Sequence, residues 1–361
     1  MKAHHLLLIS FVTSTALSAG FLLSSCFPAP ETPPTNILNI IRLDPPTLLQ
    51  FSEDLIPLKY LPLSFPSDCG LYDIFPPPRG TILAVELSCS FGQAVLFLDT
   101  ETGSVTQAFP QADSHFLTWT ANSTAIFLRV DGSASPRIVR VNVETLDAEN
   151  IPITEFTYDL SSKPDSFDFT FTFSRGFGFG SEIYLAKNDG RIFQLLYADP
   201  LNYISFARWS ADGKQIAFIK TPDSQTPFTI GELWVMQANG SNARKLADVD
   251  AGHGYAANWS PDGNRIAFVL RENVEDVNAN ESADALISNI YIVDITTNEI
   301  TQVTNFGEDR VETPHWSPDG NSLFFTRVLN GRMEVQVKSL LTDEIKILIA
   351  ESACCVSWMR K

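Results

Sequence analysis

The chain has 361 residues, of which 44% are hydrophobic, and its formal charge is −17 because 42 Asp and Glu outnumber 25 Lys and Arg. The hydrophobic content is too high for a disordered chain and is sufficient for a large core. The negative charge repels nucleic acid and anionic lipid head groups, so we expect no nucleic-acid partner.

The N-terminal segment has the pattern of an export signal. An apolar run over residues 6–23 follows Lys2 and leads into a Leu-Ser-Ser-Cys sequence that ends at Cys26. This sequence resembles the bacterial lipobox, in which two small residues precede the cysteine that receives lipid. We therefore predict a lipoprotein signal peptide over residues 1–25 and lipid attachment at Cys26. An uncleaved anchor helix is the alternative, and the polar residues within the run argue against it.

Residues 26–36 are rich in proline and predict an extended tether between the lipid and a globular body. Acyl chains can hold even an acidic protein at a membrane. We therefore expect an extracytoplasmic protein that is anchored to a bacterial outer membrane or to the outer face of the plasma membrane. Residues 37–67 form an N-terminal extension, and the repeats begin at residue 68.

Four cysteines remain in the body: Cys69, Cys89, Cys354 and Cys355. An exported chain folds in an oxidising compartment, which permits disulfides. Because Cys69 lies near the start of the repeats and the Cys354-Cys355 pair near their end, we predict a bridge from Cys69 to Cys354 or Cys355. Four reduced, buried thiols are the alternative. The lack of a Cys-x-x-Cys motif and the presence of only 5 His argue against a zinc site.

The body contains an internal repeat that is centred on tryptophan. Trp209, Trp259 and Trp316 each begin a Trp-Ser-x-Asp-Gly turn that precedes a short apolar strand, and Trp119 and Trp358 continue the spacing on either side. The repeated turn residues are Asp212, Gly213, Asp262, Gly263, Asp319 and Gly320. Each period predicts four short strands, and all-β units of roughly 40 to 50 residues are typical of propeller blades.

We interpret these recurring residues as structural rather than catalytic. An indole ring fills the wedge between neighbouring blades, and Asp-Gly fixes a tight turn because glycine readily adopts the left-handed conformation.

The repeats resemble those of the TolB family of envelope propellers, whose signature is Trp-Ser-Pro-Asp-Gly followed by an Ile-Ala-Phe strand. The match is near-complete over residues 204–350 and weak before residue 200. The resemblance implies a propeller, commonly of six blades, that works by binding protein or ligand. Two features depart from the family: the lipobox, and residues 37–67, which are too short and too rich in proline for a separate α/β domain.

We predict an all-β fold, a six-bladed β-propeller of four-stranded blades over residues 68–361. The sequence from Cys354 to Trp358 is typical of a first strand that lacks following partners, and a closed ring must pair such an edge. Six blades result if this strand joins the blade near Cys69. Seven are the alternative, if residues 37–67 supply three outer strands around it.

Two consecutive repeats have long connections between their second and third strands, over residues 221–230 and 271–288. Insertions on one face of a repeat array often mark its binding face, so we place the partner site there. The second connection also alternates oxygen side chains as calcium loops do, although the glycine and the final glutamate of such loops are missing. Its candidate calcium ligands are Asp276, Asn278, Asn280 and Asp284.

No Gly-x-Ser-x-Gly elbow or phosphate-binding loop occurs, and the sequence ends at Lys361 without a segment for a hydrolase domain. We therefore predict that the protein is not an enzyme but a monomeric, membrane-anchored scaffold that binds an envelope protein or another surface ligand without a cofactor. The alternative is a secreted propeller enzyme that acts on a glycan or peptide inside its channel.

Overall fold

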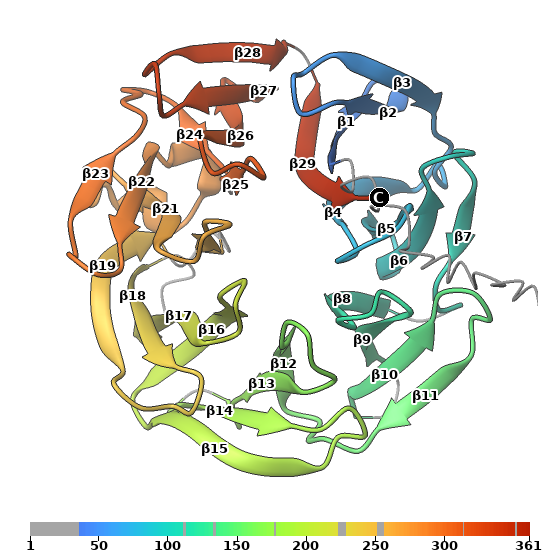
Figure 1. The fold of residues 1–361 in the computed structure, drawn as a ribbon, viewed down its shortest axis with the longest axis vertical. Helices are drawn as coiled ribbons and strands as arrows, with labels where there is room; N and C mark the ends of the chain where they lie inside the picture. Colours follow the sequence, from blue (N-terminus) through green and yellow to red (C-terminus); the bar gives the residue numbers. More distant parts are fainter. Residues whose placement is uncertain are drawn as a thin grey trace, which may run out of the picture. The chain divides into compact units, whose positions relative to one another are not determined.

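The computed structural model describes residues 36–110, 113–132, 135–176, 178–222, 229–250, 256–312, 314–350 and 352–361. The predicted signal peptide, Cys26 and the tether before residue 36 lie outside these ranges. Within them, no helix is long and apolar enough to cross a membrane. The described residues form seven antiparallel sheets arranged as the blades of a ring (Figure 1).

In each blade, the first strand named lies nearest the centre of the ring and the last lies at its rim (Figure 1). Blade 1 contains β29 (Ala353–Arg360), β1 (Asn36–Leu43), β2 (Pro46–Phe51) and β3 (Pro57–Pro62). Blade 2 contains β4 (Cys69–Phe75), β5 (Ile82–Cys89), β6 (Gly92–Asp99) and β7 (Val105–Gln107). Blade 3 contains β8 (Asp113–Trp119), β9 (Ala125–Asp131), β10 (Arg137–Asn142) and β11 (Ala148–Ile151). Blade 4 contains β12 (Thr157–Ser162), β13 (Phe169–Phe173), β14 (Ser181–Ala186) and β15 (Ile192–Asp199).

The remaining blades carry the three clearest repeats. Blade 5 contains β16 (Asn202–Trp209), β17 (Gln215–Pro222), β18 (Ile230–Gln237) and β19 (Arg244–Asp250). Blade 6 contains β20 (Asn258–Trp259), β21 (Arg265–Arg271), β22 (Ser288–Asp294) and β23 (Ile300–Gln302). Two short helical turns, η1 (Val277–Asn280) and η2 (Ala283–Ala285), lie between β21 and β22. In blade 7, β24 (Arg310–Val311) and β25 (His315–Trp316) both pair with β26 (Ser322–Leu329), followed by β27 (Arg332–Ser339) and β28 (Ile345–Ile349).

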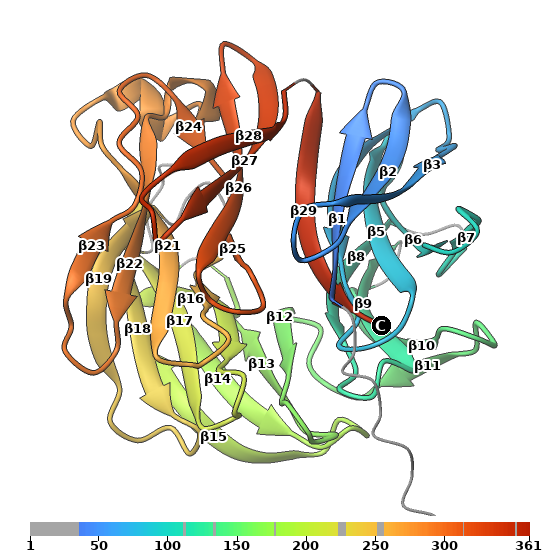
Figure 2. The same cartoon turned by 45° about the horizontal axis from the view of Figure 1, so that its top comes forward.

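The ring has seven blades, so the predicted six-bladed propeller is wrong and the seven-bladed alternative describes the fold. Strand β29 from the end of the chain pairs antiparallel with β1, with Leu38 opposite Trp358 and Ile41 opposite Cys354. Figure 2 shows these two strands side by side. Residues 36–62 thus supply the three outer strands of the blade that the last strand begins, and this pairing removes two open sheet edges.

Tryptophan side chains bridge successive blades. Their indole Nε1 groups donate to backbone carbonyls of the preceding inner strand, with N–O distances of 3.0 Å for the pairs Trp119 and Phe75, Trp259 and Arg208, and Trp316 and Asn258. Trp358 instead packs edge-on against Phe324 of blade 7, at 5.4 Å between ring centroids. Trp209 is also buried, but its Nε1 has no hydrogen-bond partner among the described residues.

The Asp and Gly residues of the repeat build the turn between the first two strands of a blade. Each Asp Oδ1 accepts from the serine hydroxyl two residues earlier and from the backbone N–H two residues later; the three aspartates are Asp212, Asp262 and Asp319. The following glycines have left-handed φ values of +66°, +70° and +70° at Gly213, Gly263 and Gly320. These contacts are local, so the turn needs no partner from another blade.

The disulfides differ from the predicted bridge between Cys69 and Cys354 or Cys355. Cys69 is bonded to Cys89, and Cys354 to Cys355. The physical reason is strand register, because Cys69 and Cys89 lie directly opposite each other on β4 and β5, with 4.0 Å between their Cα atoms. Backbone pairing of β29 with β1, rather than a covalent link between these two regions, closes the ring.

Candidate functional site

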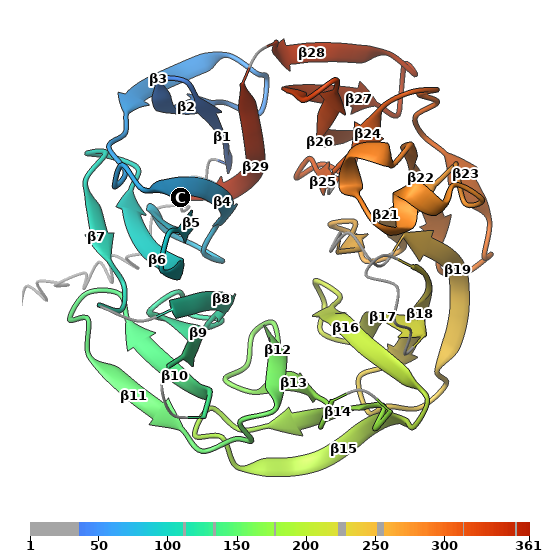
Figure 3. The same cartoon turned by 180° about the vertical axis from the view of Figure 1, so that it is seen from behind.

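The long connections and several polar strand ends lie on one face of the ring. Adjacent strands are antiparallel, so each inner strand begins, and each second strand ends, at the same end of its blade. This face, here called the loop face, therefore holds the start of β8, the end of β9 and the connections that follow β17 and β21. Figure 3 shows the ring from behind, with the connection between β21 and β22 drawn in orange.

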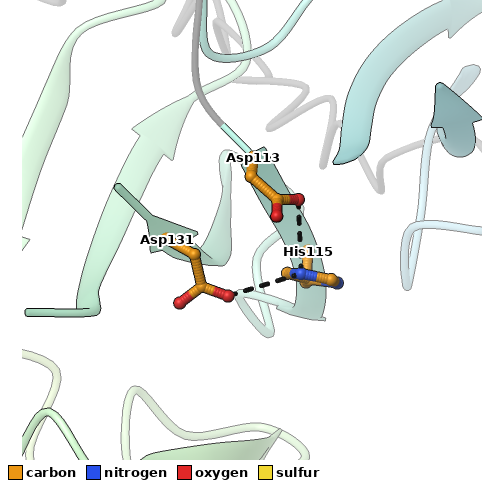
Figure 4. A group of neighbouring side chains, drawn as sticks. All are labelled: Asp113, His115 and Asp131. Atoms are coloured by element: carbon orange, nitrogen blue, oxygen red, sulfur yellow. Dashed lines mark ion pairs between the residues drawn. The ribbon is translucent and has the colours of Figure 1, made fainter. Parts of the chain in front are cut away.

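A histidine and two aspartates come together on the loop face of blade 3 (Figure 4). The Nε2 atom of His115 lies 3.5 Å from Oδ1 of Asp113 and 3.5 Å from Oδ2 of Asp131. One donor atom from each residue can be chosen so that all three atoms lie within 4.8 Å of one another. The side chain of His115 is 38% exposed, so solvent and ligands can reach the cluster.

Strand register explains why these side chains meet. Asp113 and His115 are two residues apart on β8 and therefore point to the same side of the sheet. Asp131, at the end of β9, lies directly opposite Asp113. The backbone N–H of Gln93 donates to Asp113 Oδ1 at 2.6 Å, which holds that carboxylate in place.

A buried carboxylate from blade 2 completes the arrangement. Glu86 on β5 is 5% exposed, and its Oε1 lies 3.5 Å from Nδ1 of His115. Its second oxygen accepts from the backbone N–H of Phe116 at 3.4 Å. The imidazole is therefore held between a carboxylate of blade 2 and two carboxylates of its own blade. The contact with Glu86 raises the pKa of His115, and burial of the ring opposes this rise.

The neighbouring part of blade 2 is also acidic. Asp73 on β4 lies opposite Glu86 in the strand register. Burial raises the pKa of Asp73 to about 7, a hydrogen bond from the backbone N–H of Ile74 opposes the rise, and the charges of Glu86 and Glu312 add to it. Asp73 can therefore hold a proton near neutral pH, which gives this region a proton donor next to a carboxylate.

The predicted calcium ligands make contacts with other groups of the protein. Asp276 accepts from the backbone N–H and the side-chain amide of Asn278 and caps η1. Asn280 Oδ1 accepts from the Arg271 guanidinium at 2.7 Å, and the exposed Asp284 faces Arg310 at 3.7 Å. Two of the four proposed oxygen ligands thus face arginines. The other long connection is described only at its ends, because residues 223–228 lie outside the described ranges.

Sequence reasoning missed the cluster around His115. Its residues come from three strands and two blades, and no contiguous motif joins them. One signal was present: an Asp-x-His pair at strand spacing, in a body with few histidines. Such a pair alone carries no information about Asp131 or Glu86, because only sheet register and blade packing bring those carboxylates to it.

Known proteins share the repeat pattern and the propeller fold of this chain. Residues 175–348 match the family model described as the TolB beta propeller domain. The solved structure of TolB from Acinetobacter baumannii superposes with a TM-score of 0.52 at 17% identity, over 88% of this chain and 79% of that chain. At 17% sequence identity, this similarity shows a common fold alone, not a common function.

Two curated relatives have names that denote peptidases. The uncharacterized peptidase YuxL of Bacillus subtilis is 26% identical over 143 residues, 33% of this chain and 21% of the relative. Dipeptidyl-peptidase 5 of Porphyromonas gingivalis is 21% identical over 150 residues, 41% of this chain and 21% of the relative. The matched regions thus span about a fifth of each relative. These relatives contradict the prediction that the protein is not an enzyme, since similar repeats occur in peptidases and missing nucleophile motifs do not exclude activity.

Proposed function

Because the chain belongs to the TolB-like β-propeller family, we propose that it is an extracytoplasmic propeller that binds a peptide segment of an envelope protein on its loop face. The observation that carries this proposal is the cluster of Asp113, His115 and Asp131, which reaches solvent at an inner strand of that face. Ligand sites commonly contain a small number of convergent polar groups that fix the orientation of the ligand. The strand ends that border the two long connections lie on the same face and support this choice.

Charge supports a basic ligand. Three carboxylates, those of Asp113, Asp131 and Glu86, face one imidazole, and the whole chain has a formal charge of −17. An acidic surface attracts ammonium and guanidinium groups and speeds their association. A peptide rich in lysine or arginine therefore fits this face better than an acidic one.

Fluorescence anisotropy with labelled basic, neutral and acidic peptides tests this proposal on the mature, detergent-solubilised protein in the presence of a chelator. We expect basic peptides to bind, and Asp131→Asn to weaken binding at least about fivefold, the effect of roughly 1 kcal/mol. Asp343→Asn is the matched control, because Asp343 lies between β27 and β28, at the end of its blade opposite the loop face, and its side chain is 94% exposed. Equal affinity for all three peptide classes, or equal losses in both variants, would contradict the proposal.

Peptide hydrolysis is the second candidate function. The peptidase relatives favour it, and so does Asp73, because its pKa of about 7 lets this carboxyl group, opposite Glu86 in the strand register, take up or release a proton near neutral pH. Mass spectrometry of the same peptides after incubation separates the two functions. Defined cleavage products that are lost in Asp73→Asn favour hydrolysis, whereas intact peptides that remain bound favour a binding role.

The lipid anchor belongs to the proposal as well. The lipobox-like sequence ending at Cys26 and the proline-rich residues after it support attachment to a membrane outside the cytoplasm. Mass spectrometry of the N-terminal peptide is expected to find an acylated Cys26, and Cys26→Ser is expected to move the protein from the membrane fraction to the soluble fraction. An unmodified Cys26, or a variant that stays in the membrane fraction, would contradict this part.

A further inference from the structure

The geometry around His115 points to a function beyond peptide binding. We propose that Asp113, His115 and Asp131 bind a divalent transition-metal cation of the Mn²⁺ type. One imidazole nitrogen and two carboxylates form a donor set that suits such a cation, and the nitrogen distinguishes it from the all-oxygen sets that calcium and magnesium prefer.

The distances fit ligands around an ion better than direct hydrogen bonds. Both contacts of His115 Nε2 measure 3.5 Å, whereas N–H···O hydrogen bonds usually span about 2.7 to 3.2 Å. Ligand atoms about 2.1 Å from one cation lie roughly 3.0 to 4.2 Å apart in an octahedral arrangement. The two 3.5 Å contacts fall inside this range, and the three donor atoms lie within 4.8 Å of one another, so rotation of the side chains can bring them around one cation.

Glu86 faces the second ring nitrogen of His115. Histidine ligands usually donate their second ring N–H to a carboxylate, which fixes the ring and increases the basicity of the coordinating nitrogen. Glu86 Oε1 faces Nδ1 at 3.5 Å, so Nε2 is the nitrogen that faces the two aspartates. Three carboxylates around one imidazole favour a positive charge at this place, and a bound cation supplies such a charge.

The two aspartates are held in position by groups that are not themselves ligands. Arg129 Nε donates to Asp131 Oδ1 at 3.0 Å, which leaves Oδ2 facing His115. Gly92 lets the Asp113 carboxylate lie close to the backbone, because a Cβ atom at Gly92 would be only 2.5 Å from Asp113 Cγ. The remaining coordination positions are open to water or to a ligand, since His115 and Asp113 are 38% and 37% exposed.

Isothermal titration calorimetry with MnCl₂ on the mature, metal-stripped protein tests the site directly, without a peptide. We expect one Mn²⁺ per chain, loss of that binding in His115→Gln, and binding weakened about 10- to 100-fold in Glu86→Gln, the usual effect of removing the partner of a histidine ligand. Asp343→Asn is the control and should bind as the wild type does, because this exposed aspartate lies outside the cluster. Circular dichroism of each variant shows whether it has folded.

A spectroscopic measurement tests the site in the wild-type protein, so it does not require any variant to fold. Electron spin echo spectra of bound Mn²⁺ should show modulation from an imidazole nitrogen. Absence of binding at 1 mM MnCl₂, binding without nitrogen modulation, or full binding by a folded His115→Gln protein would each overturn the proposal. Peptide binding is measured in the presence of a chelator, and Mn²⁺ binding is measured without a peptide. The two proposals are therefore tested independently of each other.

Discussion

At the scale of single residues, two of the repeat tryptophans differ in the hydrogen bond of the indole Nε1 group. Trp209 and Trp316 are both 7% exposed and both face a cationic side chain, Lys163 and Arg265 respectively. Trp316 donates to the Asn258 carbonyl, whereas Trp209 Nε1 has no partner within the described part of the chain. Burial and ring contacts are therefore similar, and the hydrogen bond differs.

This difference predicts unequal costs for the same substitution. Trp316→Phe is expected to lower the free energy of unfolding by about 1 kcal/mol more than Trp209→Phe, because it leaves the Asn258 carbonyl without its donor. Urea unfolding of both variants measures the difference. Equal losses would show that the indole hydrogen bond contributes nothing to stability.

His315 predicts how stability depends on pH. Burial lowers the pKa of this imidazole to about 4, against an unfolded value near 6.5. Above pH 6.5 both states are neutral, and below it the unfolded state binds the proton first, so stability falls as the pH drops from 6.5 to 4. The loss amounts to about 2 kcal/mol at pH 5.

His315→Asn removes this titration and is expected to reduce the difference in unfolding free energy between pH 7 and pH 5 by about that amount. Urea unfolding at the two pH values measures the difference. An unchanged difference would assign the acid sensitivity to other groups.

At the scale of elements, turns differ in how closely they approach the neighbouring blade. Gly263 and Gly240 both have positive φ, +70° and +85°. A Cβ atom at Gly263 would have ordinary contacts at 3.9 Å, whereas one at Gly240 would lie 2.3 Å from the Leu196 carbonyl oxygen on β15 of blade 4. The hairpin between β18 and β19 therefore packs tightly against the neighbouring blade.

Substitution by alanine separates the two effects. Gly263→Ala is expected to cost about 1 to 2 kcal/mol from backbone strain alone. Gly240→Ala carries that strain and a further cost of roughly 1 to 3 kcal/mol from overpacking. Thermal unfolding of both proteins compares them, and similar melting temperatures would contradict the tight contact.

At the scale of the whole molecule, β29 determines whether the ring is closed. It lies between β1 of its own blade and the strands of blade 7, and Trp358 packs on Phe324 across that boundary. Without β29, β1 would expose an unpaired edge whose residues Leu38, Ile40 and Ile41 are fully buried in the closed ring.

Removal of residues 353–361 is expected to open the ring and cause the chain to aggregate, because an apolar strand edge pairs with other chains. Light scattering and size-exclusion chromatography measure this. Removal of Lys361 alone is the control, since it lies outside β29 and should leave the protein in its original state. A soluble, cooperatively unfolding protein without residues 353–361 would contradict the role of β29.

The sequence by itself determined the all-β blades and their turns, because a turn such as Ser260-Pro261-Asp262-Gly263 is built from contacts between residues a few positions apart. Only the tertiary structure decided the seventh blade, the disulfides and the cluster around His115. Strand β1 meets β29 from opposite ends of the chain, and Glu86 reaches His115 only after two blades have packed. Such pairings depend on strand register and on closure of the ring, and neither can be predicted from residues that are neighbours in the sequence.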